Sequence, residues 1–340
     1  MLTLNCVTPH QFVYKDAPMP ELVPGSAILQ VCRVGLCGTD YHAYKGEQPF
    51  FEYPRILGHE IAARIIEISD CSHGFEVGES VTVVPYLSCG QCIACLHQKP
   101  NCCENISVIG VHEDGAFQEF ISVPISSLIK AGDLSFDELA LIEPLAIGAH
   151  GVAVAGECLG ENLLVIGAGP IGLATAKIAQ IKGAKVMVAD FAESRLKFCT
   201  DQLKIADVIN LSSESMEEGI NRITSGAKPT IIIDCTGNQT AINGALDHLA
   251  HGGIIVLIGL QKKEIIFSHP AFHKREATLR SSRNALKADF DFVIEAIARK
   301  EIDPSSFITK VIAFEELADN FEQLLNSQNE IIKVLVSIAE

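Results

Sequence analysis

Cys37, His59 and Glu60 offer a thiolate, an imidazole and a carboxylate, three groups that bind transition metals. Zinc usually takes four ligands in a tetrahedron, and a catalytic zinc site keeps one of the four positions for water or substrate. A mixed set of three protein donors fills the tetrahedron only in part. These residues therefore indicate a catalytic zinc site.

A second group of possible ligands consists of cysteines at short spacing. Its members are Cys89, Cys92, Cys95 and Cys103. Four thiolates close a tetrahedron around zinc and leave no open position, which is the arrangement of a structural site. A redox-active thiol cluster is the alternative interpretation. Cys102 adjoins Cys103, and the residues alone do not decide which of the two takes part. Two zinc ions per chain are therefore expected, each with a different role.

A glycine-rich segment predicts a dinucleotide site. The GxGxxG motif runs from Gly167 to Gly172 and includes Gly169, Pro170 and Ile171. An apolar strand pattern precedes it, a helix pattern follows it, and Asp190 ends the next strand about 20 residues on. In such motifs the glycines allow a tight turn and a close approach of the pyrophosphate to the helix amides. Gly259, at the end of a later strand pattern, is expected to line the same site.

The residues after the glycine motif favour NAD over NADP. Asp190 can accept hydrogen bonds from both ribose hydroxyls, and its charge repels a 2′-phosphate. Arg195 lies nearby and has two interpretations, a contact with adenine or phosphate and a solvated helix face.

Composition limits the class of protein. A chain of 340 residues is expected to form about two domains. The formal charge of −16 argues against nucleic acid, because phosphate binding needs clustered Lys and Arg. The apolar stretch Leu163–Ala176 is shorter than the ~20 residues of a membrane span. With no secretory leader at Met1–Cys6, a cytoplasmic location is expected, where cysteines favour metals over disulfides.

The pattern of apolar residues changes along the chain. Up to about residue 147 it is β-rich and often interrupted by glycine and proline, which indicates an irregular barrel-like domain. From Asn162 short apolar strands alternate with helices, which predicts an α/β fold with a doubly wound parallel sheet. Periodicity leaves open whether the last segment extends this sheet or returns to the first domain.

Several motifs occur together in an order typical of one family. They are Cys37-Gly38-Thr39-Asp40, Gly58-His59-Glu60, the cysteine cluster, Glu143-Pro144 and the glycine motif. The whole chain resembles the zinc-dependent medium-chain alcohol dehydrogenases, and within them the polyol branch of sorbitol and threonine dehydrogenases. Three segments are similar to bacterial sugar-acid dehydrogenases that act on L-galactonate or L-gulonate: Phe50–Arg55, Val108–His112 and Ser281–Ala285.

The resemblance implies a division of the chain. A GroES-like catalytic domain with a structural-zinc lobe is expected over residues 1–147, and a Rossmann NAD-binding domain over 148–285. Residues 286–340 are expected to return to the catalytic domain. Because family members are usually dimers or tetramers, a homodimer or homotetramer is expected.

The resemblance also assigns roles to site residues. Cys37, His59 and Glu60 would hold the catalytic zinc, Cys103 would complete the structural site, and Asp40 would orient the histidine. Glu143 stands where liver-type enzymes have a cysteine. It has three possible roles at the metal: a ligand, a ligand that exchanges with Glu60, or a partner of bound water. A simple helix cap is the fourth alternative.

Thr39 and His42 match the family's proton relay from the alcohol to solvent, and an ordinary surface histidine is the alternative for His42. Arg283 and Asn284 follow a strand pattern where the polyol branch places a substrate arginine. A guanidinium can bind a carboxylate with two parallel hydrogen bonds.

These features together predict NAD-dependent oxidation of a secondary alcohol on a small-molecule sugar acid, which gives a keto acid. A polyol or L-threonine dehydrogenase is the alternative of the same kind. A non-catalytic zinc-bearing regulator is the alternative from another class. A zinc-free quinone or enoyl reductase is disfavoured by the complete ligand sets.

Overall fold

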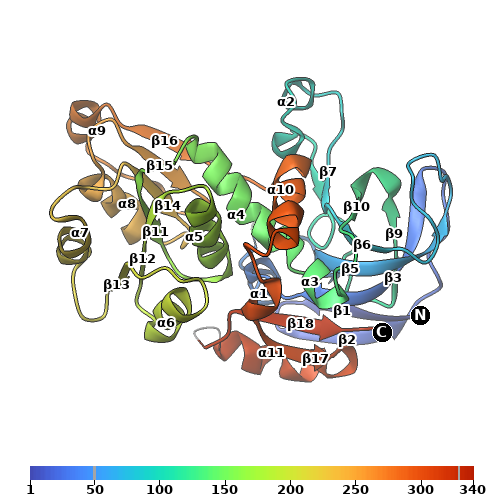
Figure 1. Cartoon of the computed structure of the whole chain (residues 1–340). Helices are drawn as coiled ribbons and strands as arrows, with labels where there is room; N and C mark the ends of the chain where they lie inside the picture. The colour runs from blue at the N-terminus through green and yellow to red at the C-terminus, as the bar shows by residue number, and fades with distance from the viewer. Residues whose placement is uncertain (49–50, 328–329) are drawn as a thin grey trace. The chain divides into compact units, whose positions relative to one another are not determined.

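The computed structural model describes residues 1–48, 51–327 and 330–340, which form two compact units (Figure 1). Unit 1 comprises Met1–Glu143 and Asp303–Glu340, and unit 2 comprises Pro144–Ile302. Unit 1 therefore contains both ends of the chain, and unit 2 is an insertion into it. Together they are the GroES-like and Rossmann parts of an α/β fold.

Unit 1 is built on a sheet of seven strands. They follow the order β10-β6-β5-β3-β18-β17, and β9 also pairs with β3. The strands are β3 (Ser26–Gly35), β5 (Glu60–Ile68), β6 (Ser80–Val83), β9 (Phe120–Pro124), β10 (Leu128–Lys130), β17 (Ile308–Ala313) and β18 (Lys333–Ser337). Apolar residues of β3 and β5, such as Val31, Ile61 and Ile65, are fully buried and form the core of this unit.

Smaller elements complete unit 1. Two small sheets have the orders β2-β1-β4 and β7-β8. Their strands are β1 (Leu2–Thr8), β2 (Gln11–Asp16), β4 (Arg55–Ile56), β7 (Tyr86–Leu87) and β8 (Ser107–Val108). The helical segments are α1 (Gly38–Tyr44), α2 (Ile93–Leu96), η1 (Pro100–Cys102), η2 (Ile125–Ser127), α3 (Phe136–Leu139), η3 (Pro304–Phe307), η4 (Phe314–Glu316) and α11 (Leu317–Asn326).

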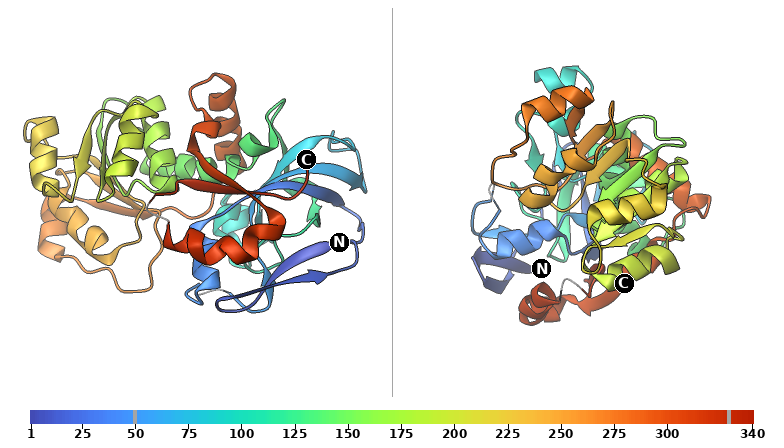
Figure 2. Two further views of the ribbon diagram at one scale, coloured as in Figure 1. Left: turned by 90° about the horizontal axis from the view of Figure 1, so that it is seen from below. Right: turned by 90° about the vertical axis from the view of Figure 1, so that its left-hand side faces the viewer.

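The C-terminal segment packs in unit 1. Strand β18 pairs antiparallel with β3, which brings the C-terminal segment beside a strand from the first part of the chain (Figure 2). The ring of Phe321 on α11 lies 4.7 to 5.2 Å from the rings of Phe12, Tyr41 and Tyr44. These contacts anchor α11 against α1, the helix that follows Cys37.

Unit 2 contains a parallel sheet in the order β13-β12-β11-β14-β15-β16. The strands are β11 (Asn162–Ile166), β12 (Lys185–Asp190), β13 (Val208–Asn210), β14 (Ile231–Asp234), β15 (Ile254–Leu257) and β16 (Thr278–Ser281). The helices are α4 (Ile142–Ala155), which begins in unit 1, α5 (Pro170–Ile181), α6 (Glu193–Asp201), α7 (Met216–Thr224), α8 (Gln239–His248), α9 (His269–Arg275) and α10 (Lys287–Ala298). The strand order reverses between β11 and β14, and ligands of such sheets bind at the carboxyl ends of the strands near that reversal.

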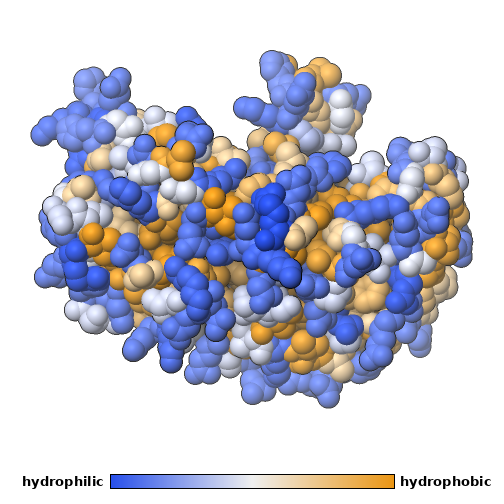
Figure 3. All heavy atoms as spheres, in the orientation of Figure 1, coloured by the Kyte–Doolittle hydropathy of each residue, from blue (hydrophilic) through white to orange (hydrophobic). Residues whose placement is uncertain are grey.

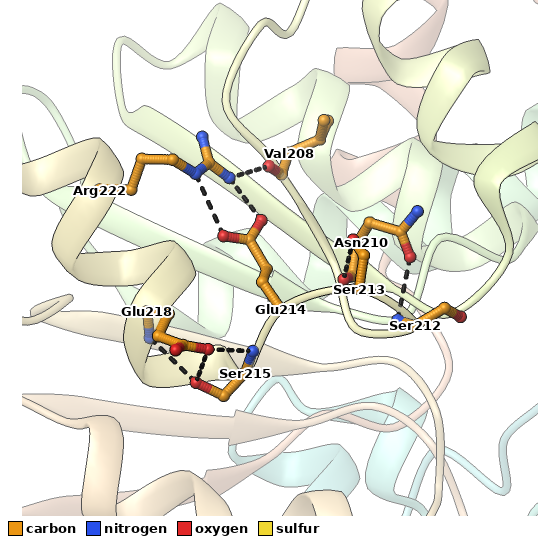
Figure 4. A network of polar contacts seen from close by, with 8 residues as sticks. All are labelled: Val208, Asn210, Ser212, Ser213, Glu214, Ser215, Glu218 and Arg222. Atoms are coloured by element: carbon orange, nitrogen blue, oxygen red, sulfur yellow. Dashed lines mark hydrogen bonds and ion pairs between the residues drawn. The ribbon is translucent and has the colours of Figure 1, made fainter.

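Local capping fixes the start of α7 (Figure 4). The Ser215 hydroxyl accepts from the Glu218 amide, and the Glu218 carboxylate accepts in return from the Ser215 amide. Arg222 donates to both carboxylate oxygens of Glu214 and to the carbonyl of Val208. The helix is thereby tied to strand β13.

The boundary between the units differs from the one expected after residue 285. Helix α10 belongs to unit 2, and the return to unit 1 begins at Asp303. Two side-chain contacts hold α10 in unit 2. Asp289 of α10 lies 2.8 Å from His150 of α4, and the ammonium group of Lys182 lies over the ring of Phe292 on α10. The first boundary lies at Glu143, four residues before the expected position at residue 147.

One helical stretch is long and apolar enough to cross a membrane by length and composition, Phe136–Ala155. Since 78% of its apolar window is buried within the protein, it behaves as a core helix. On the face drawn in Figure 3, hydrophilic side chains interrupt the hydrophobic ones throughout.

Candidate active site and metal centres

The mixed ligand set comes together in unit 1. The ligand atoms of Cys37, His59 and Glu60 all lie within 4.8 Å of one another. Cys37 caps α1, while Glu60 is the first residue of β5 and His59 directly precedes it; β5 pairs with β3 so that Glu60 faces Gly35. Both His59 and Glu60 are buried, with exposed fractions of 5% and 0%.

Asp40 connects the two segments that carry these ligands. One of its oxygens accepts from the Cys37 amide at 2.9 Å, and the other accepts from the Gly58 amide at 3.1 Å. The second oxygen also lies 3.9 Å from Nδ1 of His59. Burial raises the pKa of Asp40, which is opposed by the charge of His59 and by the amide hydrogen bonds. Asp40 therefore fixes the backbone on both sides of the cluster.

The chemistry of the cluster fits zinc. Within the described part of the chain, Nδ1 of His59 is one of the few buried side-chain nitrogens without a hydrogen-bond partner. Burial alone would lower the pKa of His59, but the Cys37 sulfur, Asp40 and Glu143 raise it well above the ordinary value. Such concentrated negative charge around an imidazole is the environment that a divalent cation neutralises.

A buried lysine that the sequence analysis missed contacts the same cluster. The Nζ atom of Lys333 lies 2.6 and 2.7 Å from the two oxygens of Glu60, and it donates to the Leu36 carbonyl at 3.0 Å. Lys333 is 2% exposed. A single charged residue at the start of the apolar run of β18 was the available signal, since a buried lysine needs a partner.

Glu143 lies in the first turn of α4 and is buried, but it does not belong to the group of three ligands. The hydroxyl of Tyr86 donates to one of its carboxylate oxygens. Burial raises the pKa of Glu143 to about 7, with His59 opposing the shift. Tyr86 was also missed, because nothing in the spacing connects β7 with α4.

The expected relay residues lie on α1. Thr39 is half-buried, and His42 is exposed. The Nδ1 atom of His42 lies 3.2 Å from a carboxylate oxygen of Glu47, which also contacts Lys45 at 2.9 Å. His42 is therefore open to solvent, which is what a group that exchanges protons with water needs.

The four cysteines of the second group also come together. The ligand sulfurs of Cys89, Cys92, Cys95 and Cys103 lie within 4.8 Å of one another. Backbone amides donate to the sulfurs of Cys89 and Cys92 and lower both pKa values, that of Cys89 to about 6. Exposed Cys102 stands outside the group. The arrangement suits a closed tetrahedral zinc site.

The glycine motif forms the turn between β11 and α5 in unit 2. A Cβ atom on Gly172 would lie 1.7 Å from the carbonyl oxygen of Gly167, so only glycine permits this close packing. Gly167 has a φ of 96°, and Gly169 and Pro170 begin α5, with Ile171 in its first turn. The amides at the start of this helix are oriented as an anion site requires.

Asp190 ends β12 and supports the glycine turn. Its two oxygens accept from the amides of Ala168 at 2.6 Å and Ala192 at 2.7 Å. A guanidinium nitrogen of Arg195 lies 3.9 Å from the position that a Cβ on Gly169 would take. Arg195 is therefore near the phosphate-binding turn.

The loops after β14 and β15 lie against each other in the same unit. A Cβ on Gly259 would lie 2.0 Å from the amide nitrogen of Gly237. Buried Asp234 accepts from the amides of Thr236 and Gly237 and shapes this loop. The sequence analysis missed Thr236 and Gly237, although their position after a buried strand was a usable signal.

The expected substrate residues also lie in unit 2. Arg283 is exposed and Asn284 is half-buried directly after β16. Of the segments similar to sugar-acid enzymes, Phe50 lies outside the described residues. In another, Nδ1 of His112 accepts from the Val108 amide at 3.1 Å, a turn contact that gives no direct indication of substrate.

Comparison with known proteins gives a consistent result. Residues 23–133 match the alcohol dehydrogenase GroES-like domain, and residues 170–299 match the zinc-binding dehydrogenase domain. The chain is 41% identical to L-galactonate-5-dehydrogenase of Escherichia coli K12 over 99% of both chains. It is 29% identical to sorbitol dehydrogenase of Bacillus subtilis, over 94% of this chain and 92% of the relative. The crystal structure of RspB from E. coli CFT073 with NADH superimposes with a TM-score of 0.93 at 30% identity, over 99% of both chains.

Proposed function

Since the chain belongs to the zinc-binding alcohol dehydrogenases, oxidoreductases that act on CH–OH groups with zinc and a nicotinamide cofactor, we propose that it oxidises a secondary hydroxyl of a sugar acid. The product is a keto acid, and NAD is the hydride acceptor. The substrate resembles L-galactonate or L-gulonate. This proposal concerns the substrate and the roles of individual residues within the enzyme class.

One observation carries the choice of a sugar acid. It is the 41% identity, over nearly the whole chain, to an enzyme named for L-galactonate. Arg283 supports the choice, because an exposed guanidinium after β16 supplies the positive charge that a carboxylate needs and a neutral polyol does not.

Unit 1 would supply the metal and the proton path. Cys37, His59 and Glu60 would hold the catalytic zinc, with Glu143 beside them as an alternative ligand. When bound, zinc supplies the positive charge that lowers the pKa of the alcohol, and NAD accepts the hydride. Thr39 would pass the released proton towards His42, which exchanges it with solvent.

Unit 2 would bind the cofactor. The amides at the start of α5 would hold the pyrophosphate, and Arg195 would add a positive charge beside them. Asp190 would accept from the ribose hydroxyls with the lone pairs that Ala168 and Ala192 leave free. Gly259 would line the floor of the site at the end of β15.

The cysteine cluster would hold the second zinc and stabilise its lobe without taking part in turnover. We also expect a cytoplasmic homodimer or homotetramer, which light scattering on the purified protein would measure.

A polyol or L-threonine dehydrogenase is the second candidate. The 29% identity to a sorbitol dehydrogenase and the 30% identity to an L-threonine 3-dehydrogenase of Cutibacterium acnes favour it. It differs from the first proposal in needing no positive charge in the substrate site.

The test is NAD reduction with a panel of C5 and C6 aldonates, sorbitol, xylitol and threonine. We expect an aldonate to give the highest kcat/KM, and Arg283→Ala to raise KM for the acid at least about tenfold while hardly changing it for a polyol of equal length. Good oxidation of polyols or threonine with no aldonate activity would select the second candidate. No turnover with any compound would instead point to a zinc-bearing regulator.

A further inference from the structure

We propose that Tyr86 is a positioning residue of the active site, through which the hairpin that carries the cysteine cluster holds the carboxylate of Glu143. The inference rests on the proposed function, since it assumes that Glu143 acts beside the catalytic zinc. It goes further by giving the cysteine cluster an indirect role at the active site. The cluster supplies no reacting group, but it fixes the strand from which Tyr86 reaches Glu143.

Tyr86 lies at the base of a hairpin whose loop is the cysteine lobe (Figure 1). Strands β7 and β8 pair antiparallel, with Tyr86 opposite Val108 and Leu87 opposite Ser107. All four cysteines of the cluster lie in the chain between these two strands. An isolated two-stranded hairpin is marginally stable at best in water, and this ladder is very short. The loop must therefore be held by other contacts.

The cluster supplies contacts between the two arms of the hairpin. The amide of Cys89, just after β7, donates to the sulfur of Cys103, just before β8, at 3.2 Å. The sulfur of Cys103 also lies 3.8 Å from that of Cys92. A zinc ion bound by the four thiolates would join the arms by coordination bonds. Loss of that ion would therefore loosen β7 and with it the backbone of Tyr86.

The side chain of Tyr86 leads from this hairpin to the active site. Its hydroxyl donates to Oε1 of Glu143, which lies 57 residues later, in the first turn of α4. Glu143 is 3% exposed, and Tyr86 is half-buried. A hydrogen bond to a carboxylate away from bulk water is stronger than one between neutral groups, so it restricts the motion of the carboxylate.

Glu143 is close enough to the metal ligands for its position to matter. Burial raises the pKa of Glu143, the charge of His59 lowers it, and the charge of Glu60 raises it. Glu143 nevertheless stands outside the group of three proposed zinc ligands, whose ligand atoms lie within 4.8 Å of one another. A glutamate side chain is flexible, so α4 alone does not fix the distance from its carboxylate to those ligands. The hydrogen bond from Tyr86 fixes Oε1 and thereby defines the place of the other oxygen.

The test is fluorine NMR on zinc-loaded protein made with 3-fluorotyrosine. The chain has five tyrosines, so the signal that is missing from Tyr86→Phe identifies Tyr86. The fluorine is next to the hydroxyl, and its chemical shift therefore reports the hydrogen bond. We expect Glu143→Met, which removes the acceptor, to move the Tyr86 signal and to leave the other signals nearly unchanged.

The role of the cluster is tested by removing its zinc. Cys95→Ser should lose one zinc ion and move the Tyr86 signal in the same direction as Glu143→Met. Cys102→Ser is the matched control, because it makes the same chemical change at an exposed neighbour outside the cluster. It should keep both zinc ions and an unchanged Tyr86 signal. If Cys95→Ser does not fold, chelation of Cys37→Ser, which is expected to retain only the cluster zinc, should move the signal in step with zinc release.

Steady-state kinetics test the effect on the active site. We expect Tyr86→Phe to lower kcat about tenfold and to change KM less than about threefold, because the reaction needs Glu143 in one place and substrate binding does not. In the Glu143→Met background the same change should alter kcat by no more than about twofold. Tyr44→Phe is the matched control, since the Tyr44 hydroxyl donates to the carboxylate of Glu322 at 3.0 Å elsewhere in unit 1. It should change kcat by less than about twofold.

Several outcomes would overturn the inference. They are a Tyr86 signal that stays in place when the cluster zinc is lost, a shift of equal size in Cys102→Ser, and a loss of kcat in Tyr86→Phe that is undiminished in the Glu143→Met background. A wild-type protein that is inactive on every compound of the panel would refute the proposed function instead. The spectra need no substrate and would still decide the inference in that case.

Discussion

Replacing Asp190 by serine tests the cofactor site, because Asp190 has two roles that separate measurements can distinguish. Its carboxylate supports the glycine turn through the amides of Ala168 and Ala192, and its charge faces the place expected for the 2′-position of the ribose. A serine hydroxyl is neutral and can accept from only one of these amides. The change should therefore weaken both NADP exclusion and the turn.

The magnitude of the charge effect follows from Coulomb's law. Two unit charges about 5 Å apart at an effective dielectric constant near 20 repel by about 3 kcal/mol. Asp190 is half-buried, so solvent reduces this to about 2 kcal/mol, equivalent to a preference of roughly 30-fold. We expect wild-type kcat/KM to favour NAD by at least this factor, and Asp190→Ser to reduce the ratio about tenfold.

The structural effect is measured without cofactor. Loss of one amide acceptor should lower the free energy of unfolding by about 1 kcal/mol in urea titrations. Asp247→Ser is a matched control, since it makes the same change of net charge at an exposed position on α8. It should alter neither quantity. Equal efficiency of the wild-type protein with NAD and NADP would refute the reasoning, as would an unchanged ratio in Asp190→Ser.

Three further predictions concern metal and stability. Metal analysis of the purified protein should give two zinc ions per chain. The Cys89→Ser variant should lose one zinc ion and unfold more easily. The Cys37→Ser variant should lose the other zinc ion and all turnover while it remains folded. Less than one zinc per chain in unchelated protein would contradict both assignments. Phe321→Ala should lower the free energy of unfolding of unit 1 by about 3–5 kcal/mol in denaturant titrations, because it removes a fully buried ring that anchors α11. A decrease below about 1 kcal/mol would contradict this packing. Ser215→Ala should cost about 1 kcal/mol through loss of the α7 cap, and Ser213→Ala, in the preceding loop, is its control with an expected change below about 0.5 kcal/mol.

The sequence determined the features that depend on short spacing. The short spacing between Cys89 and Cys103 means that only a small loop must close to bring the thiols together, so the sequence predicts the cluster that the sulfurs form. The turn at Gly167 and Gly172 follows from the absence of side chains where helix and strand meet. The strand and helix pattern of unit 2 followed from periodicity, because each buried strand is continuously apolar.

Tertiary structure alone decided the partners of the two carboxylates and the place of the C-terminal segment. Lys333 and Glu60 are 273 residues apart, and Tyr86 and Glu143 are 57 apart, so no local pattern connects them. The apolar run of β18 is compatible with either sheet, and only its pairing with β3 brings Lys333 to Glu60. A buried charge must find an opposite charge when the chain folds, and which one it finds depends on the register of strands far apart in sequence.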